Sequence, residues 1–149
     1  MTTDSNTTSY EHILALITAI INEPENKRAR ANLYKEIKTA QFFVAAYSLP
    51  LPVVHGTARH EPHKVDDVTK IPLYTAVGAD GSKALLAYLD TETLNKHCKD
   101  AFIITLSGAE LLNLVHLQAH LAAVVLNTTA GWIGIPQTDV RFLLKGYAP

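Results

Sequence analysis

Apolar residues follow helical spacing in the first part of this chain and form strand-length runs in the rest, and this change of period constrains the fold most strongly. Tyr10–Asn22 and Glu25–Gln41 repeat apolar side chains every three or four positions and are separated by the helix breaker Pro24. This pattern predicts two amphipathic helices. From Phe42 onwards, short apolar runs alternate with short helical segments. The order predicts an α/β (α+β) fold with two leading helices and then a mixed β-sheet.

Turn residues bound the apolar runs of the second part and define its elements. Runs rich in β-branched and aromatic residues predict strands over Phe42–Tyr47, Ile71–Val77, Ala84–Leu89, Ala101–Thr105 and Ala122–Asn127. Helices are predicted over Thr91–Lys99, from the capping-box sequence Ser107-Gly-Ala-Glu110 to about Gln118, and over Gln137–Lys145. We interpret residues 1–9 as a disordered N-terminus, Leu49–Asp67 as a long loop and Thr128–Gly134 as a turn-rich connection, all within one domain spanning residues 1–149.

The composition excludes several classes of protein. Hydrophobic residues make up 48% of the chain and charged residues 18%, which excludes intrinsic disorder because the apolar surface suffices for a stable core. Thirteen Lys and Arg balance fourteen Asp and Glu, so we expect no binding to nucleic acid. The single Cys98 allows no internal disulfide, and the apolar run Ile13–Ile21 is too short to cross a bilayer. We therefore expect a cytoplasmic protein without a secretion signal or a membrane span.

Few residue pairs could support catalysis. Cys98 follows His97, but adjacent residues on a helix point in different directions, so His97 is poorly placed to act as its base. We expect a buried, inert thiol. The chain has neither a Gly-x-Ser-x-Gly nucleophile elbow nor a glycine-rich phosphate loop. We predict that the protein is not an enzyme and that it uses no cofactor.

Histidines are the remaining candidates for metal ligands. His116 and His120 have the i, i+4 spacing of a helical metal site, but the glutamate of a His-Glu-x-x-His motif is missing and the helix is predicted to end between them. His55, His60 and His63 lie in the long loop and could supply three ligands. Loop histidines are more often solvated side chains, so we predict no metal and retain these three as candidates for an alternative function.

Several short motifs lie in the second half of the chain. They are Lys70-Ile-Pro-Leu-Tyr-Thr75, Ala84-Leu-Leu-Ala-Tyr-Leu-Asp-Thr-Glu-Thr-Leu94, Ser107-Gly-Ala-Glu-Leu-Leu112, Val124-Val-Leu-Asn127 and Pro136-Gln-Thr-Asp-Val140. With the order of the predicted elements, they resemble the N-terminal domain of the SseB family of bacterial proteins. Thr128-Thr129 departs from this family, which commonly has Pro-Gly there. The resemblance implies a fold and an occasional link to secretion systems, and no catalytic residues.

Two segments are candidates for a binding surface. Trp132 and Ile133 lie in the turn-rich connection, where Trp132 either anchors an interface or fills the edge of the core. The long loop adds Glu61, Asp66 and Asp67, whose charges could steer a partner. These segments favour binding to another protein.

The sequence therefore predicts a non-catalytic bacterial SseB-like protein-interaction module. It would act as a secretion-system-associated adaptor or as an immunity protein that binds and blocks a toxin. The alternative is a metal- or small-molecule-binding protein that uses the loop histidines. A homodimer formed through the weakly polar side of the first helix is a third interpretation.

Overall fold

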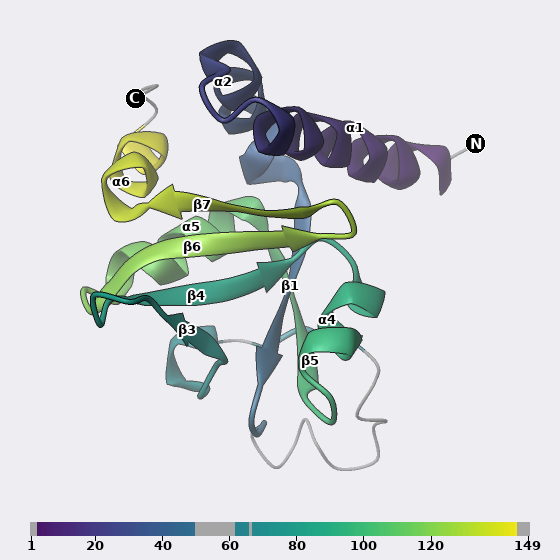
Figure 1. Cartoon of the computed structure of the whole chain (residues 1–149). Helices are drawn as coiled ribbons and strands as arrows, with labels where there is room; N and C mark the ends of the chain where they lie inside the picture. Colours follow the sequence, from purple (N-terminus) through teal and green to yellow (C-terminus); the bar gives the residue numbers. More distant parts are fainter. Residues whose placement is uncertain (1–2, 50–61, 66, 146–149) are drawn as a thin grey trace.

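A computed structural model describes residues 3–49, 62–65 and 67–145, with only the backbone of residues 3–9, and shows an α/β fold around one mixed sheet (Figure 1). The strands are β1 (Gln41–Ala46), β2 (Pro62–His63), β3 (Thr75–Val77), β4 (Lys83–Tyr88), β5 (Phe102–Ser107), β6 (Leu121–Thr128) and β7 (Gly131–Pro136). Their order is β2-β5-β1-β4-β6-β7, with β3 paired to β4. The β2/β5 and β4/β6 pairs are parallel and the others are antiparallel.

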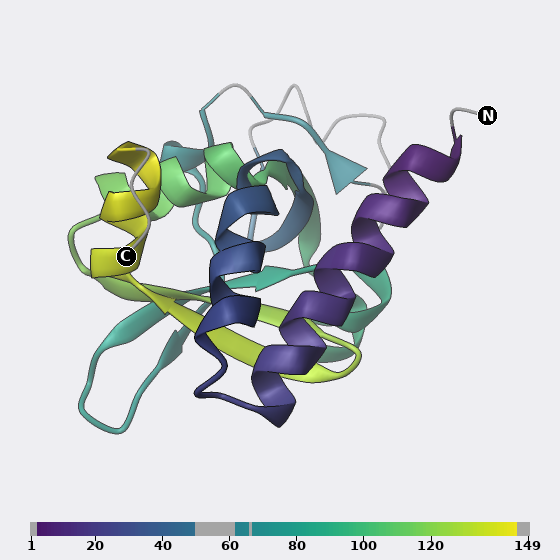
Figure 2. The same cartoon turned by 90° about the horizontal axis from the view of Figure 1, so that it is seen from above.

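Helices precede the sheet and connect its strands, as the change of apolar period predicts. The α-helices are α1 (Thr3–Asn22), α2 (Lys27–Glu36), α4 (Thr91–His97), α5 (Gly108–Leu117) and α6 (Gln137–Lys145), and the 3-10 helices are η1 (Ile37–Thr39) and η2 (Val68–Lys70). Figure 2 shows α1 and α2 lying over the β6–β7 side of the sheet. No helix in the described ranges is long and apolar enough to span a membrane.

Three boundaries differ from the sequence-based predictions by four residues or more. The helix α1 begins at Thr3, so the prediction of a disordered segment over residues 1–9 is wrong from Thr3 onwards. The second helix ends at Glu36 and gives way to η1. The predicted strand over Ile71–Val77 is regular only from Thr75, because Pro72 has no N–H to donate to a ladder; before Thr75 the segment meets β1 in an isolated bridge between Leu73 and Ala46.

The prediction of a turn-rich connection over Thr128–Gly134 is also wrong. Only residues 129 and 130 connect the strands, and β7 pairs with β6 along its whole length. Gly131 has a positive φ of 133°, as a turn requires, but Gly134 lies within β7 opposite Val125. Of the two glycines in this segment, only Gly131 has a turn conformation.

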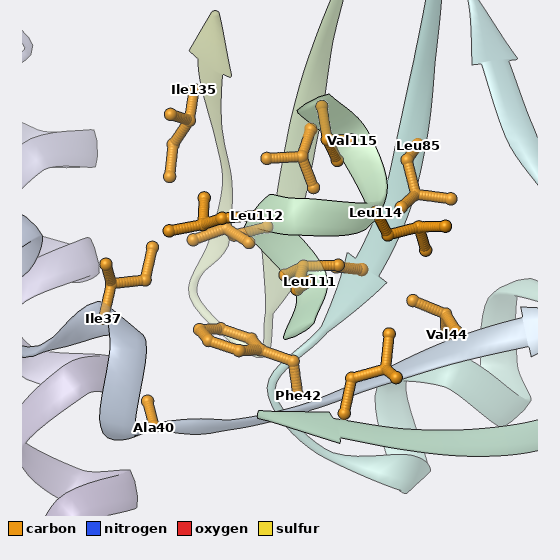
Figure 3. Close-up of a cluster of buried hydrophobic side chains, with 14 of the residues drawn as sticks. Ile37, Ala40, Phe42, Val44, Leu85, Leu111, Leu112, Leu114, Val115 and Ile135 are labelled. Carbon is orange, nitrogen blue, oxygen red and sulfur yellow. The ribbon is translucent and has the colours of Figure 1, made fainter. Parts of the chain in front are cut away.

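The main core lies on the side of the sheet covered by α1, α2, α5 and α6. Strand alternation directs Phe42 and Val44 of β1, Leu85 of β4 and Ile135 of β7 to this side, and all four side chains are buried. Figure 3 shows Phe42 and its strand neighbours facing the leucines of α5. This core holds most of the buried apolar side chains in the described ranges.

A second and smaller core lies on the opposite side of the sheet, under α4. Ala45, Tyr88 and Ile103 face Leu94 and Cys98 of this helix. Asp90 caps α4 by accepting a hydrogen bond from the backbone N–H of Thr93 over 2.7 Å. The helix is short, so it covers β1 and the end of β4, and no other helix in the described ranges packs on that side.

A hydrogen-bonded network ties α2 to β7 and α6. Arg30 donates to the hydroxyl of Tyr34 over 2.9 Å and to the carbonyl of Gly134 over 3.2 Å, and Tyr34 donates to Asp139 over 2.8 Å. Burial raises the pKa of Tyr34 to about 12, so the hydroxyl stays protonated and can donate. Arg30 also satisfies a carbonyl on the outer edge of β7, which protects this edge strand.

The predicted capping box at the start of α5 is confirmed. Ser107 accepts from the N–H of Glu110 over 3.1 Å, and the Glu110 carboxylate accepts from the N–H of Ser107 over 2.8 Å. Lys64, 2.8 Å from the Glu110 carboxylate, lowers the pKa of that carboxyl.

Ser107→Ala is expected to lower the free energy of unfolding by about 1 kcal/mol, because the N–H of Glu110 loses its acceptor at the helix start. Urea unfolding followed by circular dichroism measures this change. Ser107→Asp restores an acceptor and should recover most of the loss; if it unfolds as easily as Ser107→Ala, the cap has no stabilising role.

Candidate functional site

The side of the sheet that carries α4 presents apolar and neutral polar side chains, and no charged residue, along five of its strands. The residues on this side are Gln41, Phe43 and Ala45 of β1, Ala84, Leu86 and Tyr88 of β4, Ile103, Thr105 and Ser107 of β5, Ala123, Val125 and Asn127 of β6, and Trp132, Gly134 and Pro136 of β7. Register and the alternation of side chains along a strand place them together. Most exposed strand surfaces carry charges, so this composition is unusual for a solvated face.

The part of this surface beyond α4 is accessible, and we call it the open face. It comprises Leu86, Val125, Trp132 and Gly134, together with the tyrosines described below. The side chain of Trp132 is 65% exposed. A Cβ atom built on Gly134 would meet no heavy atom within 4 Å, which shows that the space above β7 is empty among the described residues. Leu86 and Val125 are half-buried and form its floor.

Two stacked tyrosines border the open face. The rings of Tyr47 and Tyr74 lie 4.0 Å apart between centroids with an interplanar angle of 12°. The backbone of Tyr74 bridges two strands, since its N–H donates to the carbonyl of Ala45 and its carbonyl accepts from the N–H of Leu86. Tyr47 is 62% exposed. The stack therefore extends the apolar band from the floor of the open face to solvent.

The register across the sheet makes this band continuous. Leu86 pairs with Val125, and Val125 pairs with Gly134. Because Gly134 has no side chain, the apolar surface of Val125 remains accessible between Trp132 and Leu86. The arrangement is a shallow, uncharged aromatic and aliphatic surface, which is suited to burying another apolar surface.

The structure separates the two neighbouring residues proposed as hydrophobic contacts. Trp132 points to the open face, whereas Ile133 is 5% exposed and lies in the main core opposite Leu126. Adjacent residues of a strand point to opposite sides, so only one of them can be an exposed contact. Ile133 therefore stabilises β7 and leaves the contact to Trp132.

Of the loop carboxylates proposed to steer a partner, Asp67 alone is described, and Glu61 and Asp66 lie outside the described residues. Asp67 caps η2 by accepting from the N–H and the hydroxyl of Thr69, and these hydrogen bonds lower the pKa of its carboxyl. The ammonium nitrogen of Lys70 lies 3.8 Å from a carboxylate oxygen of Asp67. The carboxylate of Asp67 is exposed, but its nearest partners are Thr69 and Lys70, which lie two and three residues further along the chain.

The histidines do not form a cluster in the described part of the chain. His116 lies on the last turn of α5 and His120 beyond its end, and both are exposed. His63 is buried in β2, while His55 and His60 lie outside the described residues. Among the residues that the structure describes, no three His, Cys, Asp or Glu side chains could hold a metal ion together.

Cys98 is a buried free thiol in the small core, as predicted. Its sulfur lies 3.4 Å from the hydroxyl of Tyr88, and burial raises the pKa of that hydroxyl. The ring of His97 packs edge-on against the ring of Tyr88, with 5.6 Å between centroids. Both polar neighbours of the thiol are thus engaged in packing.

Comparisons with known proteins identify no relative. The chain matches no protein-family model, no curated protein and no solved structure. The open face is therefore interpreted from its geometry.

Sequence reasoning identified Trp132 and missed the other members of the open face. Leu86 and Val125 belong to apolar runs, which indicate burial without showing on which side. One signal was available: Lys83–Tyr88 and Leu121–Thr128 are apolar at almost every position, so both of their faces need cover. Only the sheet order shows that, among the described residues, no helix covers these strands on the side of the open face.

Proposed function

We propose that this protein is a non-catalytic protein-interaction module that binds its partner through the open face. The observation that carries this proposal is the exposure of Trp132 beside Gly134, at the end of an uncharged apolar band. Tryptophan is among the residues most often responsible for binding energy in interfaces. Leu86, Val125 and the tyrosine stack surround it with apolar contacts.

The chemistry of the open face defines the partner. On this side of the sheet its strands present no charged side chain. A charge of the partner that is buried here would find no counterion and would lose its hydration. The partner surface should therefore be apolar and uncharged at its centre. Charged residues of the partner can lie only around this centre, near the exposed Lys96 in the last turn of α4 and Lys99 after its end.

The resemblance to the SseB family supports a finer proposal. A small module of this kind, encoded beside a secretion system, would act as an adaptor or as an immunity protein that covers a toxin. In α1, Ile13, Ile17 and Ile20 are buried against the rest of the fold, and none of the large exposed apolar side chains described lies on this helix. The open face is thus a better contact for a partner, or for a second copy, than α1.

The test is affinity capture with variants that keep the fold. Tagged protein expressed in its host should capture a partner in stoichiometric amount. Trp132→Ala should weaken that complex by more than about 30-fold, as expected for an interface anchor worth about 2 kcal/mol. Gly134→Lys places a charge in the empty space above β7 and should abolish capture.

Phe142→Ala is the matched control, because Phe142 is an exposed aromatic residue of α6 on the other side of the sheet. It should bind as the unchanged protein does. Equal capture by all variants, or no stoichiometric partner with and without the neighbouring genes, would contradict the proposed function.

A further inference from the structure

A pocket of about 530 Å³ lies on the other side of the sheet from the open face, where α5 ends. The helix stops at Leu117, and Gln118 turns away with an extended backbone, so the helical layer does not reach β3. Leu85 of β4 and Thr75 of β3 form the floor, and Ile71 and Leu73 form the opposite wall. The pocket is therefore a gap in the cover of the main core.

The lining combines aliphatic and polar side chains with one cationic residue. Pro72 and Leu73 contribute accessible aliphatic surface above the buried Leu85 and Ile71, and Leu117 is 61% exposed. Among the described residues that line the pocket, Lys83 alone has a permanent charge, and none of them is a carboxylate. The stem of a lysine can cover an apolar floor while its ammonium group stays in water.

Polar side chains complete the rim. Thr75, Gln118 and His120 line the pocket, as does Thr69, whose hydroxyl already donates to the carboxylate of Asp67. The absence of acidic lining residues beside a lysine makes the pocket complementary to an anion. Its volume lies in the range of small-molecule sites, roughly 300–1,000 Å³, which are mostly apolar with a few polar groups that orient the ligand.

We propose that this pocket binds a small molecule with an aliphatic chain and one carboxylate. The chain lies on Leu73, Pro72 and Leu117, and the carboxylate meets the ammonium group of Lys83. This site is independent of the partner surface, because the two lie on opposite sides of the sheet.

Octanoate is the test ligand, and octan-1-ol and octylammonium are its neutral and cationic counterparts. Titration of the full chain, followed by amide chemical shifts, should show saturable binding of octanoate with shifts at Thr75, Lys83 and Leu117. Octanoate should bind about twofold to fivefold more tightly than octan-1-ol, the range expected for a solvent-accessible charge pair. Octylammonium should bind more weakly than both.

Two variants, with one control, test the contributions of the lysine charge and of the aliphatic lining to binding. Lys83→Ala should remove the preference for octanoate over octan-1-ol, whereas Lys99→Ala, an exposed lysine after α4, should leave it unchanged. Leu117→Glu should weaken the binding of octanoate about tenfold or more. Because Leu117 is exposed, this change is compatible with folding. Equal affinities for octanoate and octan-1-ol, shifts confined to Val125 and Trp132, or no binding at all would overturn the proposal.

Discussion

Gly108→Ala is expected to destabilise the protein by more than about 3 kcal/mol, a larger effect than its single added methyl group suggests. A Cβ atom on Gly108 would lie 1.6 Å from the carbonyl oxygen of Ile37 and 2.6 Å from its carbonyl carbon. Both are backbone atoms, so no side-chain rotation can relieve the contact. The N–H of Gly108 also donates to the carbonyl of Ala40 over 2.8 Å, which holds α5 against η1.

Gly134→Ala is the matched control, because its Cβ would meet no heavy atom within 4 Å. Thermal unfolding should place Gly108→Ala roughly 6–12 °C below the unchanged protein, from about 2–4 °C per kcal/mol at this size. Gly134→Ala should unfold within about 2 °C of it. Similar transitions for the two variants would show that α5 does not approach η1 this closely.

Phe42→Ala is expected to lower the free energy of unfolding by about 3–5 kcal/mol, because it removes a ring from the centre of the main core. The side chain of Phe42 is 0% exposed. It lies among Ile37, Leu111 and Leu112, where η1, β1 and α5 meet (Figure 3). An empty cavity in this place leaves three elements without their shared contact.

Denaturant unfolding of Phe42→Ala and Phe142→Ala compares two phenylalanines of opposite exposure. Phe142 is 47% exposed on α6, so its truncation should cost less than about 1 kcal/mol. Phe42→Leu keeps most of the apolar volume and should cost clearly less than Phe42→Ala. A small loss for Phe42→Ala would mean that β1 and α5 do not pack through this ring.

Local interactions explain the elements that the sequence predicted well. The capping box at Ser107 and Glu110 needs only residues three positions apart, and α6 begins where predicted, at Gln137. Elements whose start depends on distant partners were predicted less well. The strand β7 exists because Gly131–Pro136 pairs with β6, and its glycines alone favour a turn.

The candidate site shows the same division. The sequence left two alternatives for Trp132, which could either anchor an interface or fill the edge of the core. Strand alternation directs Trp132 outward and Ile133 inward, so the tryptophan is exposed. Tyr47 and Tyr74 are far apart in the sequence, and only the insertion of Tyr74 between β1 and β4 stacks their rings. No spacing rule links two such residues.

The amino-acid sequence alone determined the fold class, the two leading helices and the surplus of apolar surface in the strands, because period and capping are properties of neighbouring residues. Tertiary structure decided which apolar surface stays uncovered. The sheet order puts β6 and β7 beyond the reach of α4, and α5 ends before β3. Helix length and strand order together therefore leave the open face and the Lys83 pocket accessible, and neither is readable from one segment of the chain.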